Sequence, residues 1–231
     1  MENLVIREAS ERDIDFIIET IIEADKSGSN VISACNILNV NELEYKDILK
    51  NILKDNIEGQ EYGLSGFLIA EYNNMPIGAL GSWVEGAGGI SSYILYSNIL
   101  LFYLDKGKIP SILENFKITK ELSFRRETGA IQMEYGFVRE EYRRRGVYTR
   151  LILESIKKYY PENKNILKAQ GICFKDNYKS LNASLKIGFK IIDSKLSENN
   201  NLKKFFPYKE KVLLELKQQE FDAVLKGDID F

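Results

Sequence analysis

A chain of 231 residues is long enough for one large domain or two small ones with a substantial core. Hydrophobic residues make up 44% and charged residues 29% of it, proportions typical of an ordinary soluble globular protein. The formal net charge of −2 gives no support for broad nucleic-acid binding. The sequence has no histidine, which excludes a Ser-His-Asp hydrolase, a Cys-His nucleophile pair, an HExxH metalloprotease and a three-histidine zinc site. A general base must therefore be a carboxylate, tyrosine, lysine, cysteine, terminus or water.

Hydrophobic periodicity predicts strands and helices that alternate through the middle of the chain. Strands are expected at residues 4–7, 67–72, 77–84, 130–138, 165–174, 189–193 and 210–216. Helices are expected at residues 11–24, 41–53, 90–104, 109–122, 146–160 and 177–186. Ser10 is expected to cap the first helix, with Asp13 as an acidic variant of the capping box. This order predicts an α/β (α+β) fold over 1–231, a single domain with a central mixed sheet flanked by helices.

A helical insertion at about 86–128 separates the third and fourth expected strands. Its segment 90–104 is apolar on most of its circumference, so this helix is expected to be buried or covered by a partner. Three roles are open: a lid over an acceptor site, a contact in a homodimer, and packing onto the domain's own core. A short C-terminal extension is expected at about 218–231.

Two widely separated cysteines, Cys35 and Cys173, suggest neither a disulfide framework nor a zinc knuckle. Cys173 lies in an apolar stretch, where a buried structural thiol is the expected role rather than a nucleophile. The N-terminus has no basic region followed by an apolar one, and the most apolar window is too short to span a bilayer. A cytoplasmic protein without membrane contact is therefore expected.

The most informative segment is Val138 to Tyr148, a predicted strand end and a turn dense in arginine that runs into a predicted helix. Such a turn presents backbone N–H groups at a helix N-terminus, where the helix dipole favours negative charge. Arg143, Arg144 and Arg145 add positive charge and forked donors at the same place. The segment predicts a site for a phosphate-rich ligand; the alternative is a solvated basic face.

Two motifs together resemble the GCN5-related N-acetyltransferase superfamily, whose members transfer acyl groups from acyl-coenzyme A. The first, Arg143-Arg-Arg-Gly146-Val-Tyr148, corresponds to the family's Arg/Gln-x-x-Gly-x-Gly/Ala between a strand and a helix. The second begins at Asn177 and ends in Lys186-Ile-Gly188-Phe189, similar to the family's Asn-x-x-(Ala/Ser)…Lys-x-Gly-Phe. The order of elements from residue 3 to about 217 also fits the family, except for the insertion.

The resemblance implies that acetyl-coenzyme A is a co-substrate and that no metal is needed. By resemblance, its pyrophosphate would be held by the backbone N–H groups of Arg144, Arg145, Gly146, Val147, Tyr148 and Thr149, with charge from Arg143. The backbone of Phe137, Val138 and Arg139 would pair with the pantetheine arm like an added strand. The family has a third small residue where this chain has Tyr148, which could crowd the pyrophosphate.

Acyl transfer to an amine requires a group that removes the ammonium proton. Glu134 is the candidate base, because strand alternation is expected to place residues 134, 136 and 138 on one face. The alternative for Glu134 is a solvated glutamate at the sheet edge. Trp83 and Glu85 are further candidates for the acceptor pocket.

The family also uses a tyrosine to return a proton to the departing thiolate, and that position falls on Ser184 here. Serine is a poorer acid with a shorter reach. Tyr178 or Tyr148 would then substitute, or the thiolate leaves unassisted.

Taken together, the motifs predict an N-acetyltransferase that moves acetyl from acetyl-coenzyme A to a primary amine by direct attack in a ternary complex. The acceptor is expected to be a small-molecule or peptide amine, which the sequence does not identify. A non-catalytic acyl-coenzyme A-binding or sensing module is the alternative. Nucleic-acid binding through the arginine turn is a third hypothesis, which the acidic balance of the chain disfavours.

Overall fold

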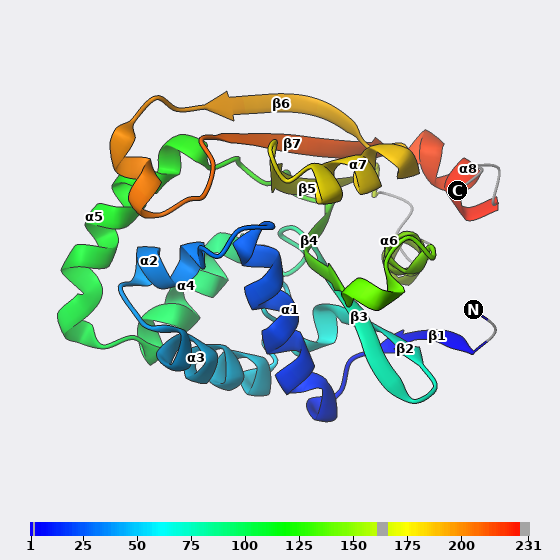
Figure 1. Ribbon diagram of the computed structural model, residues 1–231, viewed down its shortest axis with the longest axis horizontal. Coiled ribbons are helices and arrows are strands. Elements are labelled where there is room, and N and C mark those ends of the chain that lie inside the picture. The colour runs from blue at the N-terminus through cyan, green and yellow to red at the C-terminus, as the bar shows by residue number, and fades with distance from the viewer. Residues whose placement is uncertain (2, 161–165, 227–231) are drawn as a thin grey trace.

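The protein is described from a computed structural model, which covers residue 1, residues 3–160 and residues 166–226. In this part of the chain, seven strands form one sheet with helices on both faces (Figure 1). The strands are β1 (Leu4–Glu8), β2 (Phe67–Tyr72), β3 (Met75–Val84), β4 (Ile131–Val138), β5 (Lys168–Phe174), β6 (Lys190–Leu196) and β7 (Glu210–Lys217). Their order is β1-β2-β3-β4-β5-β7-β6, and β4 and β5 are parallel while the other neighbours are antiparallel. The predicted single-domain mixed sheet and its strands are confirmed; residue 165, where the fifth strand was expected to begin, lies outside the described residues.

The helices fall into two groups by the core that they cover. On one face, α6 (Val147–Tyr159), α7 (Tyr178–Ile187) and α8 (Gln218–Lys226) contribute to a core cluster with alternate residues of the central strands. On the other face lie the helices α1 (Ile14–Lys26), α2 (Ser33–Leu38), α3 (Glu42–Asp55), α4 (Ser92–Tyr103) and α5 (Ile109–Thr119). Figure 1 shows α1 to α5 gathered on one side of β4 and α6 to α8 on the other.

Two of these helices, α2 and α8, were not predicted. The six residues of α2 are too few for helical periodicity to stand out, although Cys35 and Leu38 are buried. The helix α8 occupies the described part of the expected extension and inserts the fully buried Phe221 against Tyr160. At the first helix, Ser10 donates both its N–H and its hydroxyl to Asp13, as a capping pair should, at 2.9 Å each.

The insertion packs onto the domain's own core, which was one of its three expected roles. Leu100, Leu104 and Ile112 are buried in the cluster formed by α1 and α3. The segment 90–104 is not buried around its whole circumference within this chain, because Tyr93 is 59% and Phe102 81% exposed; cover by a partner stays a prediction. The insertion therefore extends the core on one side and leaves an open surface on the other.

Strands β4 and β5 separate after two pairs of residues. Their parallel register joins Ile131 to Ala169 and Gln132 to Gln170, and within the described residues it goes no further. The remainder of β4 pairs with β3 alone, so an opening forms between β4 and β5 in the middle of the sheet.

A β-bulge in β4 changes which side chains face this opening. The register with β3 shifts between Ala79 and Gly81, and Tyr135 has a left-handed φ of 58°. Before the bulge Met133 packs with the α6 cluster, whereas after it Tyr135 and Phe137 pack with the α1 cluster. The expected alternation of residues 134, 136 and 138 is therefore wrong: Val138 faces α6, and Glu134 faces the opposite side.

Candidate active site

A cleft of about 1960 Å³ crosses the molecule where β4 and β5 separate. On one side it is lined by the arginine turn, the start of α6 and part of α7. On the other side it is lined by the end of α1, α2, the inserted helices α4 and α5, and Lys211 of β7. Predicted site residues that line it are Glu134, Phe137, Val138, Arg143, Arg144, Arg145, Gly146, Val147, Tyr148, Thr149 and Asn177.

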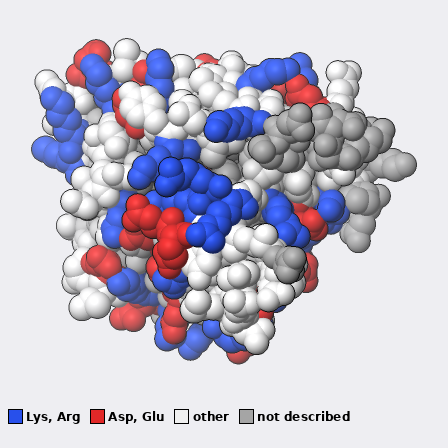
Figure 2. Space-filling view, turned by 45° about the vertical axis from the view of Figure 1, so that its right-hand side comes forward, with Lys and Arg blue, Asp and Glu red and all other residues white. Residues whose placement is uncertain are grey.

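The arginine turn has the backbone geometry of an anion site. Arg144 and Gly146 have left-handed φ angles of 60° and 76°, which turn the chain sharply into α6. The N–H of Arg150 donates to Gly146 O at 3.0 Å, and the N–H groups of the helix's first turn precede it without an intrahelical acceptor. Figure 2, which brings the right-hand side of Figure 1 forward, shows basic side chains gathered near the centre of that face with acidic ones beside them.

One arginine of the turn is a structural brace. Arg143 donates from Nε to the carbonyl of Val138 at 2.8 Å and lies over the Phe137 ring at 5.8 Å. Arg144 and Arg145 are exposed. The turn therefore offers two exposed guanidinium groups at the cleft, of which that of Arg145 lies over the Tyr142 ring at 5.9 Å, and the third ties the turn to the end of β4.

The structure does not bring Arg139 to the cleft. Its N–H donates to Ile77 O of β3 at 2.8 Å, and its side chain binds Glu19 at 3.1 Å and Pro76 O at 3.2 Å. Because N–H groups alternate along a strand, the N–H of Val138 points to the opposite edge, toward the opening. A pantetheine arm would therefore find its donor at Val138, not at Arg139.

Tyr148 fills the space beside the bulge. A Cβ on Gly136 would lie 2.6 Å from Cε2 of Tyr148, so only glycine at position 136 leaves room for this ring. Burial raises the pKa of Tyr148, although Ser184 and Ser180 partly oppose the rise. The tyrosine that departs from the family's small residue thus lies near Ser184, the position of the family's acid.

Of the two other candidate residues at the start of α7, only one lines the cleft. Tyr178 is 63% exposed and donates to Asp176 at 3.3 Å, and it does not line the cleft. Asn177 caps α7 by accepting from Ser180 N–H at 3.4 Å, and it does line the cleft. Of the two tyrosines considered for proton return, geometry favours Tyr148.

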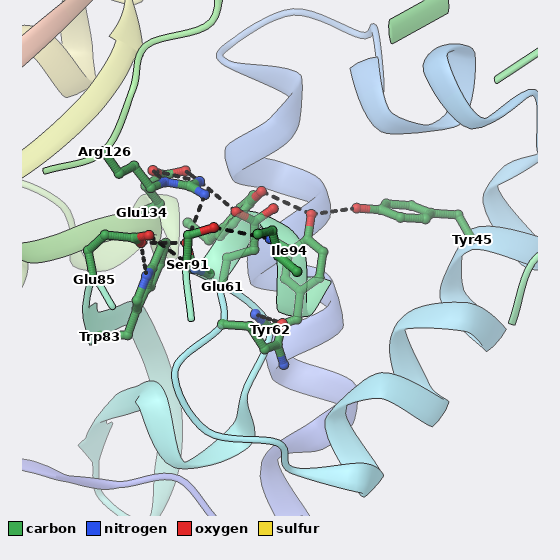
Figure 3. Close-up of polar contacts among 12 residues, drawn as sticks. Tyr45, Glu61, Tyr62, Trp83, Glu85, Ser91, Ile94, Arg126 and Glu134 are labelled. Atoms are coloured by element: carbon green, nitrogen blue, oxygen red, sulfur yellow. Dashed lines mark hydrogen bonds and ion pairs between the residues drawn. The ribbon is translucent and has the colours of Figure 1, made fainter. Parts of the chain in front are cut away.

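Trp83 and Glu85 lie behind the cleft wall. Trp83 Nε1 donates to Glu85 at 3.2 Å (Figure 3). Ser92 donates to the same carboxylate through its N–H at 3.0 Å and its hydroxyl at 2.5 Å. Glu85 therefore anchors the first turn of α4. Neither side chain lines the cleft, so the structure places both outside the expected acceptor pocket.

Two carboxylates share one guanidinium inside the cleft. Arg126 donates to both oxygens of Glu134 at 3.0 Å, and its Nη2 lies 2.5 Å from Oε2 of Glu61 (Figure 3). Burial raises the pKa of Glu61, with Arg126 opposing and Glu134 adding to the rise. The pair carries one more negative charge than Arg126 balances, and Glu61 is the carboxylate whose environment favours taking up a proton.

Tyrosines line the cleft next to these carboxylates. The Tyr62 hydroxyl donates to Tyr135 at 2.9 Å and lies 3.2 Å from that of Tyr45. Tyr96 of the inserted helix packs its ring edge-on against Tyr62, with centroids 5.1 Å apart. The insertion thus contributes directly to the wall of the cleft. Aromatic faces beside carboxylates suit a cationic group.

A second charged pair lies on the same side of the sheet. Burial raises the pKa of Asp25, at the end of α1, to about 6, against lowering by the Ala34 N–H and by Lys211. Burial lowers the pKa of Lys211, on β7, with Asp25 and Glu134 opposing. Both residues line the cleft.

Sequence patterns did not single out several residues that the fold brings into this site. They are Asp25, Glu61, Tyr62, Tyr96, Arg126, Tyr135 and Lys211. Glu61 and Arg126 lie in irregular segments, where no periodicity assigns a facing side. Strand periodicity does not predict the facing side of Tyr135, because the bulge interrupts it. The sequence signal for this bulge is the strand glycine Gly136.

No protein-family model and no curated protein matches this chain. Solved structures do resemble it. An N-acetyltransferase from Staphylococcus aureus Mu50 is 16% identical with a TM-score of 0.61, over 92% of this chain and 100% of that one. A ribosomal-protein-alanine N-acetyltransferase from Brucella melitensis is 15% identical with a TM-score of 0.51, over 92% and 99%. A chimera of the spermidine N-acetyltransferase SpeG from Vibrio cholerae and hSSAT is 12% identical with a TM-score of 0.52, over 95% and 98%.

The chain has the fold of the GCN5-related N-acetyltransferases, an open mixed sheet flanked by helices in one domain. The predicted fold class is thereby confirmed. Across the described residues, none of the helices combines the length and apolar character that crossing a membrane requires.

Proposed function

We propose that this protein transfers an acetyl group from acetyl-coenzyme A to a primary amine by direct attack in a ternary complex. The observation that carries the proposal is the continuity of one cleft. It runs from the amide-lined arginine turn, past the unpaired edge of β4, to the carboxylates Glu61 and Glu134. This arrangement suits a long ligand with a diphosphate at one end and a reacting group near a base at the other.

Each part of the cleft has a task in this reaction. Bound acetyl-coenzyme A supplies an activated thioester. The N–H groups of the first turn of α6 and the guanidinium groups of Arg144 and Arg145 would hold its phosphates. The Val138 N–H, on the open edge of β4, would bind the pantetheine arm or the developing oxyanion.

The carboxylate pair deals with the amine proton. A primary ammonium loses a proton before its nitrogen can attack, and the pair accepts it directly or through water. Glu134 remains the proposed base, and Glu61 is its partner across Arg126. As the new C–N bond forms and the C–S bond breaks, the thiolate takes a proton from Tyr148 or from water.

Coenzyme A release with a panel of primary amines tests the proposal. Turnover by the wild type, lowered about 100-fold or more in Glu134→Gln, is the expected result, since general bases typically contribute 100- to 10,000-fold. Glu42→Gln, an exposed glutamate of α3 that pairs with Lys46 and does not line the cleft, is the matched control. Full activity of Glu134→Gln would reject Glu134 as the base.

The second candidate, a non-catalytic acyl-coenzyme A-binding module, is favoured by one observation: Ser184 stands where the family has its acidic tyrosine. It predicts acetyl-coenzyme A binding without release of coenzyme A on any acceptor. We place either activity in the cytoplasm, where free thiols such as Cys35 and Cys173 remain reduced.

A further inference from the structure

The acceptor side of the cleft carries charges of both signs in separate places. Glu61 and Glu134 form its negative part, beside the tyrosines. Lys211 forms a positive part across the opening, on β7. Lys211, Glu61 and Glu134 line one continuous cleft, so a ligand bound in it meets both parts.

Lys211 is held in place without an anionic partner. Its Nζ lies over the Phe206 ring at 4.4 Å and over the Phe174 ring at 4.6 Å. Among the described residues its Nζ has neither a hydrogen bond nor an ion pair, and Asp25 acts on it at longer range. Two aromatic faces position a cation but leave its three N–H donors available.

A neighbouring lysine shows the contrast. Lys195 also lines the cleft and lies over an aromatic ring, that of Phe124, at 5.2 Å. Its Nζ, however, already donates to Ser123 O at 2.5 Å. Of these two lysines, Lys211 is therefore the one whose N–H donors are available among the described residues.

We propose that the acceptor is a small zwitterion of the amino-acid class, with its amine toward Glu61 and Glu134 and its carboxylate on Lys211. This inference rests on the proposed function. A diamine would set its second cation against Lys211, where like charges repel. The single ammonium of Lys211 suits a carboxylate as the acceptor's anionic group. A phosphate would be better matched by forked guanidinium groups such as those at the arginine turn.

Pairs of acceptors that differ only in the carboxylate test the inference. L-phenylalanine is compared with phenethylamine, L-leucine with isopentylamine and L-lysine with cadaverine, and kcat/KM is measured from coenzyme A release. Loss of a hydrogen bond to a charged group costs about 10- to 100-fold in binding. The wild type is therefore expected to favour at least one amino acid over its amine by about that factor, mainly through KM.

Three variants assign the preference to Lys211. Lys211→Met keeps an apolar stem between the two rings and is expected to bring the ratio of kcat/KM within each pair toward one. Lys211→Arg retains the positive charge and is expected to restore most of the preference. Lys195→Met, the matched control, is expected to keep the wild-type ratio.

Calorimetry separates this inference from the proposed function. The same amino acids are titrated into protein saturated with coenzyme A, so binding is read without turnover. Binding of an amino acid that weakens in Lys211→Met supports the inference. The inference would be overturned if, in every pair, kcat/KM for the amine equalled or exceeded that for the amino acid, and if Lys211→Met had the same ratios as the wild type. Turnover in that case would still support the acetyltransferase. Bound acetyl-coenzyme A with no turnover of any acceptor would instead overturn the proposed function.

Discussion

Arg126 donates two hydrogen bonds of 3.0 Å to Glu134 and also forms an ion pair with Glu61 through its Nη2. One guanidinium from the end of the insertion thus holds together a loop that precedes β2 and the middle of β4. The same contact sets the charge of the acceptor side of the cleft. Stability and function are coupled at this residue.

Replacing Arg126 by methionine is expected to lower the free energy of unfolding by about 3–5 kcal/mol, because it leaves two buried carboxylates facing each other without a counterion. Urea unfolding of the wild type and the variant at neutral pH measures the loss. Lys117→Met, which removes an exposed pair with Glu114, is expected to cost at most about 1 kcal/mol. Equal losses of unfolding free energy in the two variants would show that Arg126 stabilises the protein no more than an exposed ion pair does.

Gly136→Ala is expected to displace the Tyr148 ring, since the added Cβ would lie 2.6 Å from its Cε2. Overpacking of this kind costs about 1–3 kcal/mol. The double variant Gly136→Ala, Tyr148→Ala is expected to be less destabilised than the two single changes added together, because removing the ring removes the clash. Gly88→Ala, where a Cβ meets nothing within 4 Å, is the control. Strict additivity in urea unfolding would argue against this packing.

Asp25→Asn is expected to change how stability depends on pH. Burial raises the pKa of Asp25 from its usual 3.8 to about 6, so its stabilising contribution is present below pH 3.8 and is lost as pH rises through about 6. The loss amounts to about 3 kcal/mol, at 1.36 kcal/mol for each pKa unit. Relative to the wild type, the variant should therefore gain stability between pH 4 and pH 7.

Urea unfolding of both proteins at the two pH values makes this comparison. Asp15→Asn alters an exposed carboxylate on the same helix, and should shift stability equally at both. A pH-independent difference between the wild type and Asp25→Asn would contradict the assignment. The Ala34 N–H and Lys211, which face Asp25, oppose the rise of its pKa, and their effect is already contained in the value of about 6.

Arg144→Ala and Arg145→Ala are each expected to weaken acetyl-coenzyme A binding about fivefold, the usual effect of losing one hydrogen bond of about 1 kcal/mol. The deficit should shrink as salt rises, because both side chains are exposed. Arg150→Ala removes an exposed arginine one turn further along α6, outside the cleft, and should bind like the wild type. A similar loss in all three variants would point to general charge instead of a phosphate site.

Local signals predicted the fold and the phosphate end of the site. The arginine turn, with Gly146 at φ 76°, lies within a few residues of sequence, so its geometry follows from local residue types. The acceptor end depends on long-range placement. Glu61 meets Glu134 only because Arg126 and the β4 bulge bring separate segments together, and strand alternation gave the wrong face for Glu134 because the bulge interrupts it.

The most direct test of the account is calorimetric titration of acetyl-coenzyme A into the purified protein. The cleft predicts saturable, salt-sensitive binding of one ligand per chain, weakened in Arg144→Ala and Arg145→Ala and unchanged in Arg150→Ala. No detectable binding of acetyl-coenzyme A or coenzyme A at millimolar concentration would contradict the account.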